Sequence, residues 1–365
     1  MRIAFVLSGF GAGGAEKVVN LLAHHRQSQG DTVHVLAVNA GDPASYFPYD
    51  PGIELSTLGG SGNGAGRVSG TGRRILALRR RLAELAPDLV VSFLTKVNVM
   101  TGLATLGLDV PIVLSERNNF LSQAKSPLWR LAGPIAGRRA ARLVMQTKEA
   151  CLALPFSLQS RAIVIPNPVA SMRAARPSDG SRIVAVGRLE KQKGFDLLLE
   201  AFAQVAARLP AARLTIFGEG PERGALEKQA RDLGVADRVH MPGVTRSPGD
   251  WVVEGDIFVL SSRFEGFPNV LLEAMAAGLA VIAFDCPWGP SEILDNPDAG
   301  LLVPAGDVGR LADAMARLAT DSDLRQRLAA TGAAEAAARY SLPSVLALWD
   351  AVIAVAVTAP AAVPA

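Results

Sequence analysis

The chain has 365 residues, of which 49% are hydrophobic, 19% charged and 5% aromatic, with 35 Gly and 23 Pro. This length predicts two domains, and the composition excludes a disordered polypeptide and a low-complexity repeat. The net charge of +3 hides an asymmetry, because residues 1–180 carry 20 Lys or Arg and 11 Asp or Glu, whereas residues 181–365 carry 17 and 23. We therefore expect the first half to meet something anionic, either a lipid surface or a phosphorylated substrate, although a solvated basic surface is the alternative.

Cysteine and histidine usage excludes two kinds of organisation. Cys151 and Cys286 stand far apart without a CxxC motif, and the four histidines form no HxxxH or HxxH pair. A disulfide framework and a structural zinc site are therefore not expected, and a reducing cytoplasm fits best. The opening apolar run 3–7 is too short for a secretory signal, and no apolar stretch approaches the roughly 20 residues of a membrane span.

Strands and helices alternate along the first half. The expected strands are 2–8, 32–39, 89–94, 111–115, 143–146 and 163–165, and helices are expected at 15–29 and 73–86. Short apolar strands separated by helices predict a parallel sheet covered on both faces, so the fold class is α/β. The leucines of helix 73–86 either pack on this sheet or, with its arginines, face an anionic lipid surface. The Gly- and Ser-rich stretch 59–72 is expected to be a mobile surface loop.

The alternation restarts after a proline-rich hinge at 166–179. Strands are expected at 182–186, 213–217, 238–241, 257–260 and 280–284, with helices at 195–209, 221–233 and 269–277. The last three helices, 308–318, 323–340 and 342–355, are expected to close the second domain. We predict one Rossmann-like domain at 1–170, a second Rossmann-like domain at 171–341, a C-terminal helix at 342–357 and a disordered tail at 358–365. Two doubly wound domains predict an interdomain cleft, with ligands at the carboxyl ends of the strands.

A glycine-rich loop follows the first strand. The segment from Gly9 to Gly14 satisfies GxGxxG, but the second strand ends at Asn39 without the carboxylate that would hold a ribose, which weakens a dinucleotide interpretation. Two interpretations stay open. Gly13 and Gly14 either let the backbone approach an anion at the helix start or only form a tight turn.

Two further strand-end loops carry charges. Gly187 to Gly194 contains Arg188 and Lys193, which either neutralise a diphosphate or belong to a solvated basic loop.

The segment from Ser261 to Glu273 carries two glutamates, Glu265 in a loop and Glu273 on the first turns of a helix that Pro268 starts. The pair suits sugar hydroxyls and a ribose, with free N–H groups at 269–271 beside a phosphate, although two glutamates at this spacing also occur by chance.

Together these segments resemble glycosyltransferase family 4, the retaining nucleotide-sugar enzymes of GT-B fold. The resemblance rests on the Gly11–Glu16 loop, the Gly187–Gly194 loop, the segment 217–221 and the Glu265…Glu273 pair. It implies that the domain at 1–170 is the acceptor side and that the domain at 171–341 binds the nucleotide sugar. It also implies that Arg188 and Lys193 hold the donor diphosphate, Glu273 the ribose and Glu265 the transferred sugar, with the backbone near Met241 facing the base. The implied donor site comprises Gly13, Gly14, Gly187, Arg188, Lys193, Met241, Gly266, Phe267, Pro268, Asn269, Val270, Leu271 and Glu273.

A narrower resemblance, carried by segments 115–119 and 286–292, is to bacterial transferases that build polysaccharides or lipid-linked oligosaccharides. Many family members place a histidine at a strand end of the first domain, but this chain has none between His34 and His240. Glu116, Arg117 and Asn118 are expected to line the acceptor side instead, or else to form a capped turn. The catalytic candidates are Glu265, Arg188, Lys193 and Glu116.

We therefore predict a retaining glycosyltransferase that moves a hexose or N-acetylhexosamine from a nucleotide diphosphate sugar, with a UDP-sugar favoured, to a carbohydrate acceptor such as a polyprenyl-diphosphate-linked glycan in polysaccharide biosynthesis. The one DxD, Asp321-Ser-Asp323, is interpreted as a helix cap, so no metal or cofactor is expected. The expected location is cytoplasmic, peripheral on the inner face of the membrane, without a nucleic-acid partner. The alternatives are a GDP-mannose-dependent transferase of the same fold, a nucleotide-sugar epimerase and a non-catalytic nucleotide-sugar-binding subunit.

Overall fold

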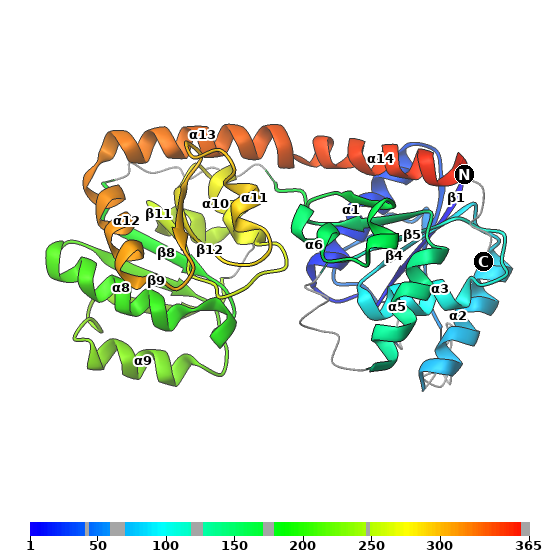
Figure 1. Ribbon diagram of the computed structural model, residues 1–365, viewed down its shortest axis with the longest axis horizontal. Helices are drawn as coiled ribbons and strands as arrows, with labels where there is room; N and C mark the ends of the chain where they lie inside the picture. The colour runs from blue at the N-terminus through cyan, green and yellow to red at the C-terminus, as the bar shows by residue number, and fades with distance from the viewer. Residues whose placement is uncertain (41–43, 59–69, 118–126, 171–178, 246–248, 359–365) are drawn as a thin grey trace. The chain divides into compact units, whose positions relative to one another are not determined.

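The computed structural model describes residues 1–40, 44–58, 70–117, 127–170, 179–245 and 249–358. The chain divides into two compact units (Figure 1). Unit 1 comprises Met1–Pro166 with Val345–Ala365, and unit 2 comprises Asn167–Ser344. Each unit contains its own parallel sheet, so the prediction of two doubly wound α/β domains is confirmed.

Unit 1 contains a seven-stranded parallel sheet in the order β3-β2-β1-β4-β5-β6-β7. The strands are β1 (Arg2–Leu7), β2 (Thr32–Ala37), β3 (Ile53–Thr57), β4 (Leu89–Phe93), β5 (Ile112–Ser115), β6 (Arg142–Met145) and β7 (Ala162–Val164). The helices are α1 (Gly14–Ser28), α2 (Thr71–Leu85), α3 (Thr95–Ala104), α5 (Pro127–Arg139), α6 (Lys148–Leu152), α7 (Phe156–Gln159) and α14 (Leu342–Thr358).

The alternation of side chains along β1 explains why both faces of the sheet are covered. Ile3, Phe5 and Leu7 pack in one core cluster with α1 and α14, whereas Ala4 and Val6 pack in the opposite cluster with α2, α3 and α5. Successive strand residues point to opposite faces, so an uninterrupted apolar strand needs a helical layer on each side.

Helix α2 packs on the sheet of unit 1, which was one of the two interpretations of its sequence. Leu78, Leu82 and Leu85 are buried in the core. Two of its arginines are engaged locally, since Arg79 donates to the carbonyl of Ala104 at 3.0 Å and Arg81 pairs with Glu54 at 3.2 Å. The protein itself therefore covers these three leucines, whereas Leu76 of the same helix is 59% exposed.

The C-terminal helix α14 belongs to unit 1. Val345, Trp349, Val352, Ile353 and Ala356 follow a helical spacing and enter the core cluster that contains β1 and α1. On the same helix, Asp350 lies 2.8 Å from both His25 Nε2 and Arg26 Nη1. The expectation that the last helix closes the second domain is therefore wrong, because its apolar stripe is buried in unit 1.

Unit 2 contains a six-stranded parallel sheet in the order β10-β9-β8-β11-β12-β13. The strands are β8 (Arg182–Val186), β9 (Arg213–Phe217), β10 (Val239–Gly243), β11 (Ile257–Leu260), β12 (Ala280–Asp285) and β13 (Leu301–Pro304). The helices are η1 (Lys191–Lys193), α8 (Phe195–Arg208), α9 (Arg223–Asp232), η2 (Asp250–Glu254), α10 (Asn269–Ala276), α11 (Pro290–Ile293), α12 (Val308–Thr320) and α13 (Ser322–Tyr340).

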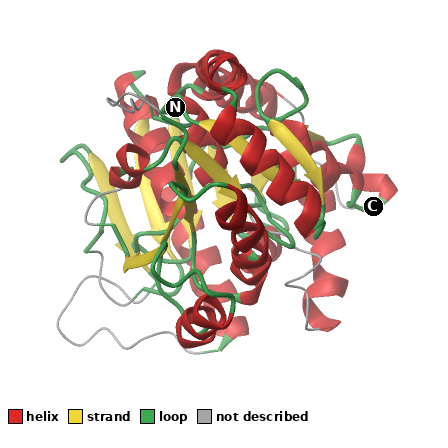
Figure 2. Ribbon diagram, turned by 90° about the vertical axis from the view of Figure 1, so that its left-hand side faces the viewer, coloured by secondary structure: helices red, strands yellow, loops and turns green. Residues whose placement is uncertain are grey.

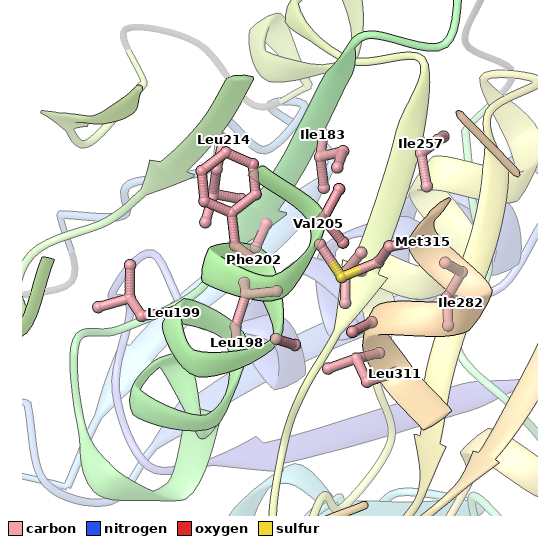
Figure 3. Packing of buried hydrophobic residues seen from close by; sticks show 14 of the residues in the cluster. Ile183, Leu198, Leu199, Phe202, Val205, Leu214, Ile257, Ile282, Leu311 and Met315 are labelled. Atoms are coloured by element: carbon pink, nitrogen blue, oxygen red, sulfur yellow. The ribbon is translucent and has the colours of Figure 1, made fainter. Parts of the chain in front are cut away.

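Helices cover both faces of this second sheet (Figure 2). Ile183 and Leu214 of the sheet pack with Phe202 of α8 and Met315 of α12 on one face (Figure 3). Val184, the neighbour of Ile183, faces the opposite cluster with α10. The predicted strands and helices agree closely with those observed, but β3 and β13 were missed.

The chain divides at Pro166 and Asn167, close to the expected boundary at 170. The expected mobile loop 59–72 falls largely on 59–69, and the expected disordered tail on 359–365; both segments lie outside the described residues.

Candidate functional site

The strand order of unit 2 reverses between β8 and β11, which are adjacent in the sheet. From β8 the chain proceeds to β9 on one side, and from β11 it proceeds to β12 on the other. In open parallel sheets ligands bind at the carboxyl ends of the strands at such a switch point. The loops that follow β8 and β11 are the two in which the sequence placed Lys193 and Glu265.

Lys193 and Glu265 meet at this edge of the sheet. Lys193 Nζ lies 2.7 Å from Glu265 Oε1, and the hydroxyl of Ser262 donates to the same oxygen at 2.6 Å. The side chains of Lys193 and Glu265 are 16% and 6% exposed. Partial burial of a charged pair strengthens its electrostatic interaction and holds both groups in fixed positions. A cation and a carboxylate from loops 72 residues apart are therefore held side by side.

Gly187 and Gly194 determine how Lys193 is held. A Cβ on Gly187 would lie 3.1–3.2 Å from Cγ, Cδ and Cε of Lys193, so the lysine stem lies against the glycine. Gly194 has φ +63°, and a Cβ there would collide with the carbonyl oxygen of Ser261. The hydroxyl of Ser261 also donates to the carbonyl of Lys193 at 2.9 Å. The loops after β8 and β11 are thus in direct backbone contact.

The loop after β12 supports the Glu265 loop from its other side. The backbone N–H of Glu265 donates to the carbonyl of Pro287 at 3.1 Å. A Cβ on Gly289, which has φ +114°, would lie 2.6 Å from Cδ of Pro268. Burial, with a further contribution from the negative charge of Glu265, raises the pKa of the Cys286 thiol to about 12. That thiol stays protonated near neutral pH, so it is not a nucleophile there.

Arg188 lies on the same loop as Lys193 but is not part of this buried pair. Its side chain is 70% exposed, and its Nη1 donates to Glu190 at 2.9 Å. Met241 lies in β10, and its carbonyl accepts a hydrogen bond from Arg223 at 3.1 Å. The structure therefore brings Lys193 and Glu265 together, with Gly187 beneath the lysine, and leaves Arg188 at the surface of the loop.

Helix α10 begins directly after the Glu265 loop. Glu273 lies on it, half-buried, and the segment that leads into it comprises Gly266, Phe267 and Pro268. The N–H of Asn269 donates to the carbonyl of Phe267, and that of Leu271 donates to the carbonyl of Pro268, both at 3.0 Å. The expectation of free N–H groups at 269–271 is therefore wrong for these two residues, because the first turn of α10 is tight.

Two side chains at this helix start are in contact with other parts of unit 2. Asn269 Oδ1 accepts a hydrogen bond from Asn167 Nδ2 at 2.8 Å, and the ring of Phe267 lies 6.4 Å from that of Tyr340. Val270 and Leu271 pack in the hydrophobic cluster on that face of the sheet. The start of α10 is thus anchored, which fixes the direction of the Glu265 loop.

The glycine loop of unit 1 leads into α1, which begins at Gly14 after Gly13. The carboxylate of Glu16 occupies the position that a side chain on Gly13 would take, and burial raises the pKa of Glu16. An anion that approaches this helix start would therefore meet the chain's own carboxylate.

Glu116 and Arg117 follow β5 in unit 1, and both are buried. The backbone N–H of Arg117 donates to Glu116 Oε1 at 3.0 Å, and Arg117 Nε donates to the hydroxyl of Ser115 at 2.9 Å. The guanidinium carbon lies 5.6 Å from the ring of Phe93 and 5.4 Å from that of Trp349. Burial lowers the pKa of Arg117 to about 9, so it keeps its charge near neutral pH. Asn118 lies outside the described residues.

Asp321 caps a helix, as the sequence predicted. It precedes α13, and its Oδ1 accepts a hydrogen bond from the backbone N–H of Leu324 at 2.9 Å. Within the described ranges, no three His, Cys, Asp or Glu side chains are grouped to hold a metal ion. Over the same ranges, no helix combines the length and the apolar character that crossing a bilayer requires.

Sequence reasoning missed Ser262, which shares the Glu265 oxygen, and Trp349, which packs on Arg117. Ser262 stands next to Ser261 without any pattern that marks it. Trp349 lies at the other end of the chain from Arg117, so no local spacing could have paired them.

Comparison with known proteins identifies the family. Residues 12–173 match the model of Glycosyltransferase Family 4, and residues 180–321 match that of Glycosyl transferases group 1. Anabaena HepE, solved in complex with UDP, superposes with a TM-score of 0.77 at 20% identity over 97% of this chain and 100% of that one. The chain belongs to glycosyltransferase family 4 and has the GT-B fold, as its sequence motifs implied.

Two curated relatives align along most of the chain. An exopolysaccharide phosphotransferase of Streptomyces coelicolor is 30% identical over 96% of this chain, which spans 40% of that protein's length. An α-1,4-N-acetyl-D-galactosaminyltransferase of Campylobacter jejuni is 23% identical over 90% of this chain and 91% of its own length. The name of the latter gives its acceptor as a glycan carried on PP-undecaprenol.

Proposed function

We propose that this protein is a retaining glycosyltransferase that moves a hexose or N-acetylhexosamine from a UDP-sugar to a carbohydrate acceptor carried on a polyprenyl diphosphate. Family membership supports the reaction class, and the UDP in the HepE structure supports the donor class. The Campylobacter relative supports the type of acceptor.

The contact between Lys193 and Glu265 carries this proposal. In a nucleotide diphosphate sugar, one glycosidic bond joins the sugar to the diphosphate. A cation that binds the diphosphate and a carboxylate that binds sugar hydroxyls must therefore be neighbours, as Lys193 Nζ and Glu265 Oε1 are at 2.7 Å. As the glycosidic bond lengthens, the leaving diphosphate gains negative charge, and the fixed ammonium stabilises it.

The other proposed roles surround this pair. Arg188 binds the diphosphate from the surface of the same loop. Its guanidinium has five N–H donors, and the bond to Glu190 uses one of them, so donors remain for the phosphate oxygens. Glu273 binds the ribose, and the backbone near Met241 faces the base. On the acceptor side, Glu116 and Asn118 contact the acceptor. The backbone N–H of Arg117 holds the Glu116 carboxylate in place, and the guanidinium of Arg117 lies between two aromatic rings.

The experiment is a transfer assay with purified protein, UDP-, GDP- and ADP-sugars and a mixture of free and polyprenyl-diphosphate-linked glycans. We expect a glycosylated lipid-linked product from a UDP-sugar, with the α or β configuration of the donor retained. Product should form at the same rate in excess EDTA, because lysine and arginine take the place of a metal ion.

Each alternative predicts a different result. Product from GDP-mannose would show that the donor carries guanine and not uracil. Conversion of the donor without an acceptor would show that the protein is an epimerase. Donor binding without turnover would assign a non-catalytic subunit. Loss of activity in EDTA that magnesium restores would contradict the metal-independent mechanism.

A further inference from the structure

An ion pair that the proposed mechanism does not use joins the loops after β8 and β11. Arg263 follows β11 and stands two residues before Glu265, and Asp196 stands on the first turn of α8, three residues after Lys193. Arg263 Nη1 donates to Asp196 Oδ1 at 2.7 Å, and Nη2 donates to Oδ2 at 2.6 Å. Two parallel hydrogen bonds between a guanidinium and a carboxylate fix the orientation of both groups as well as their distance.

Three further hydrogen bonds connect the same two loops. Arg263 Nη1 also donates to the carbonyl of Lys191 at 2.8 Å, and the backbone N–H of Arg263 donates to the carbonyl of Gln192 at 2.8 Å. Gln192 Nε2 donates in turn to the carbonyl of Phe264 at 3.0 Å. Lys191 and Gln192 directly precede Lys193, just as Arg263 and Phe264 directly precede the glutamate of the buried pair. The two loops are therefore bonded to each other over the residues that lead into that pair.

The geometry of these bonds suits an arginine and not a lysine. Nη1 of Arg263 donates both to Asp196 and to the carbonyl of Lys191, while Nη2 donates to Asp196. A guanidinium presents its donors in one plane at fixed angles, whereas the ammonium of a lysine is a point charge on a flexible stem. The hydrogen bonds from Arg263 also lower the pKa of Asp196, so the pair stays ionised near neutral pH.

The exposure of this ion pair indicates a role other than folding stability. The side chains of Arg263 and Asp196 are 39% and 42% exposed, and an ion pair this open to water contributes little to stability. Helix α8 is held without the pair, because Phe195 and Leu198 are buried in the core of unit 2. The pair instead affects geometry, and a catalytic group that is displaced by about 1 Å loses much of its effect on the rate.

We propose that Arg263, through its two bonds to Asp196, is a positioning residue that holds the buried ammonium–carboxylate pair in the geometry for sugar transfer. Ser262 precedes Arg263 in the chain and donates to Glu265 Oε1 at 2.6 Å, so the backbone that Arg263 holds also carries the hydroxyl that orients the carboxylate. Arg263 and Asp196 act through the buried pair and do not themselves contact the donor. The inference rests on the proposed function, which assigns that pair to the glycosidic bond of the donor.

The test combines transfer kinetics with UDP titration on full-length variants. Arg263→Gln and Asp196→Asn should each lower kcat about tenfold, less than a displacement of the whole loop, because the backbone bonds between the loops remain. KM for the UDP-sugar should change less, because the diphosphate carries less charge in the bound donor than in the transition state. UDP carries the full charge of the leaving group, so its dissociation constant should rise as kcat falls.

Two further variants show whether the two side chains act as one unit. Arg263→Lys should recover part of the losses in kcat and UDP affinity, because it keeps the charge without the planar fork. The double variant Arg263→Gln with Asp196→Asn should be no more impaired than either single variant, because either change alone already breaks the ion pair.

The ion pair between Arg208 and Asp313 is the matched control. It joins the end of the same helix α8 to α12 at 2.7 Å. Arg208→Gln and Asp313→Asn make the same chemical changes and should leave kcat and UDP affinity within about twofold of the wild type. Melting temperatures of all these variants should stay within about 4 °C of the wild type, since exposed ion pairs contribute little to stability.

Three results would overturn this proposal alone. They are wild-type kcat and UDP affinity in Arg263→Gln, equal losses in Arg208→Gln, and losses in the double variant that equal the product of the two single losses. No transfer from any donor by the wild type, with UDP affinity still reduced in the Arg263 and Asp196 variants, would overturn the proposed function alone.

Discussion

Replacing Lys193 by methionine is expected to lower the rate of sugar transfer at least about 100-fold, the range seen when one preorganised donor to a developing negative charge is removed. Methionine keeps an unbranched stem against Gly187 but removes the ammonium group 2.7 Å from Glu265. Because the charge on the leaving diphosphate is greater in the transition state than in the bound donor, the loss should fall on kcat more than on KM. Steady-state kinetics with the preferred donor measure it.

Lys191→Met is the matched control. Lys191 stands in the same short helix η1, is exposed, and its replacement changes the net charge by the same amount. We expect its activity to stay within about twofold of the wild type, as for most surface substitutions. Equal losses in both variants would mean that the overall charge of the loop matters and the position of Lys193 does not.

Glu265→Gln should also reduce transfer strongly, and the double variant Lys193→Met with Glu265→Gln should be far less impaired than the product of the two single effects. The effects of substitutions are not additive when the two groups act on the same bond. Removing one member of a buried pair also destabilises the protein. Circular dichroism melts therefore identify an assay temperature at which all variants are folded. If the loss of activity in the double variant equals the product of the two single losses, Lys193 and Glu265 do not act jointly.

Gly194→Ala is expected to weaken donor binding strongly. Gly194 has φ +63°, and its Cβ would collide with the carbonyl of Ser261, which belongs to the loop that carries Glu265. The two loops would have to separate, and Lys193 would lose its position beside Glu265. Isothermal titration with UDP should show at least about a 100-fold loss of affinity, in line with a displacement of about 1 Å at a preorganised site.

Gly234→Ala separates steric collision from backbone strain. Gly234 has φ +69°, nearly the value of Gly194, but a Cβ there would meet no atom within 4 Å. The left-handed conformation alone should cost about 1–2 kcal/mol of folding stability. UDP affinity should stay unchanged in this variant. Equal losses of affinity at both glycines would show that general destabilisation, and not the contact between the loops, is responsible.

The fold could be predicted from sequence because its cause is local. Each core strand is a short apolar run, and each helix between strands has an apolar stripe, as Phe195 and Phe202 of α8 show. Strand β3 escaped prediction because Glu54 and Ser56 interrupt its apolar residues at the edge of the sheet. Helix α14 was assigned to the wrong unit because its apolar stripe predicts that one face is buried but does not indicate in which of the two cores.

The site could be predicted only in part. Glycines and cations in one loop indicated Lys193, and the paired glutamates indicated Glu265. Their contact, however, depends on β8 and β11 being neighbours, and strand order is a property of the whole sheet. At Arg117 the sequence pattern indicated a ligand-binding side chain, but the structure places this side chain in the core. It follows a strand, as a ligand-binding residue would, yet Phe93 and Trp349 enclose it in the core.

The central claim is that the Lys193–Glu265 pair lies at the junction between the diphosphate and the sugar of the donor. A crystal structure of the protein with an intact, slowly hydrolysed UDP-sugar analogue tests it most directly. We predict a phosphate oxygen within hydrogen-bonding distance of Lys193 Nζ, about 3 Å, and a sugar hydroxyl at the same distance from Glu265. A donor whose diphosphate lies away from the loop after β8, with the Lys193–Glu265 pair untouched, would contradict the account.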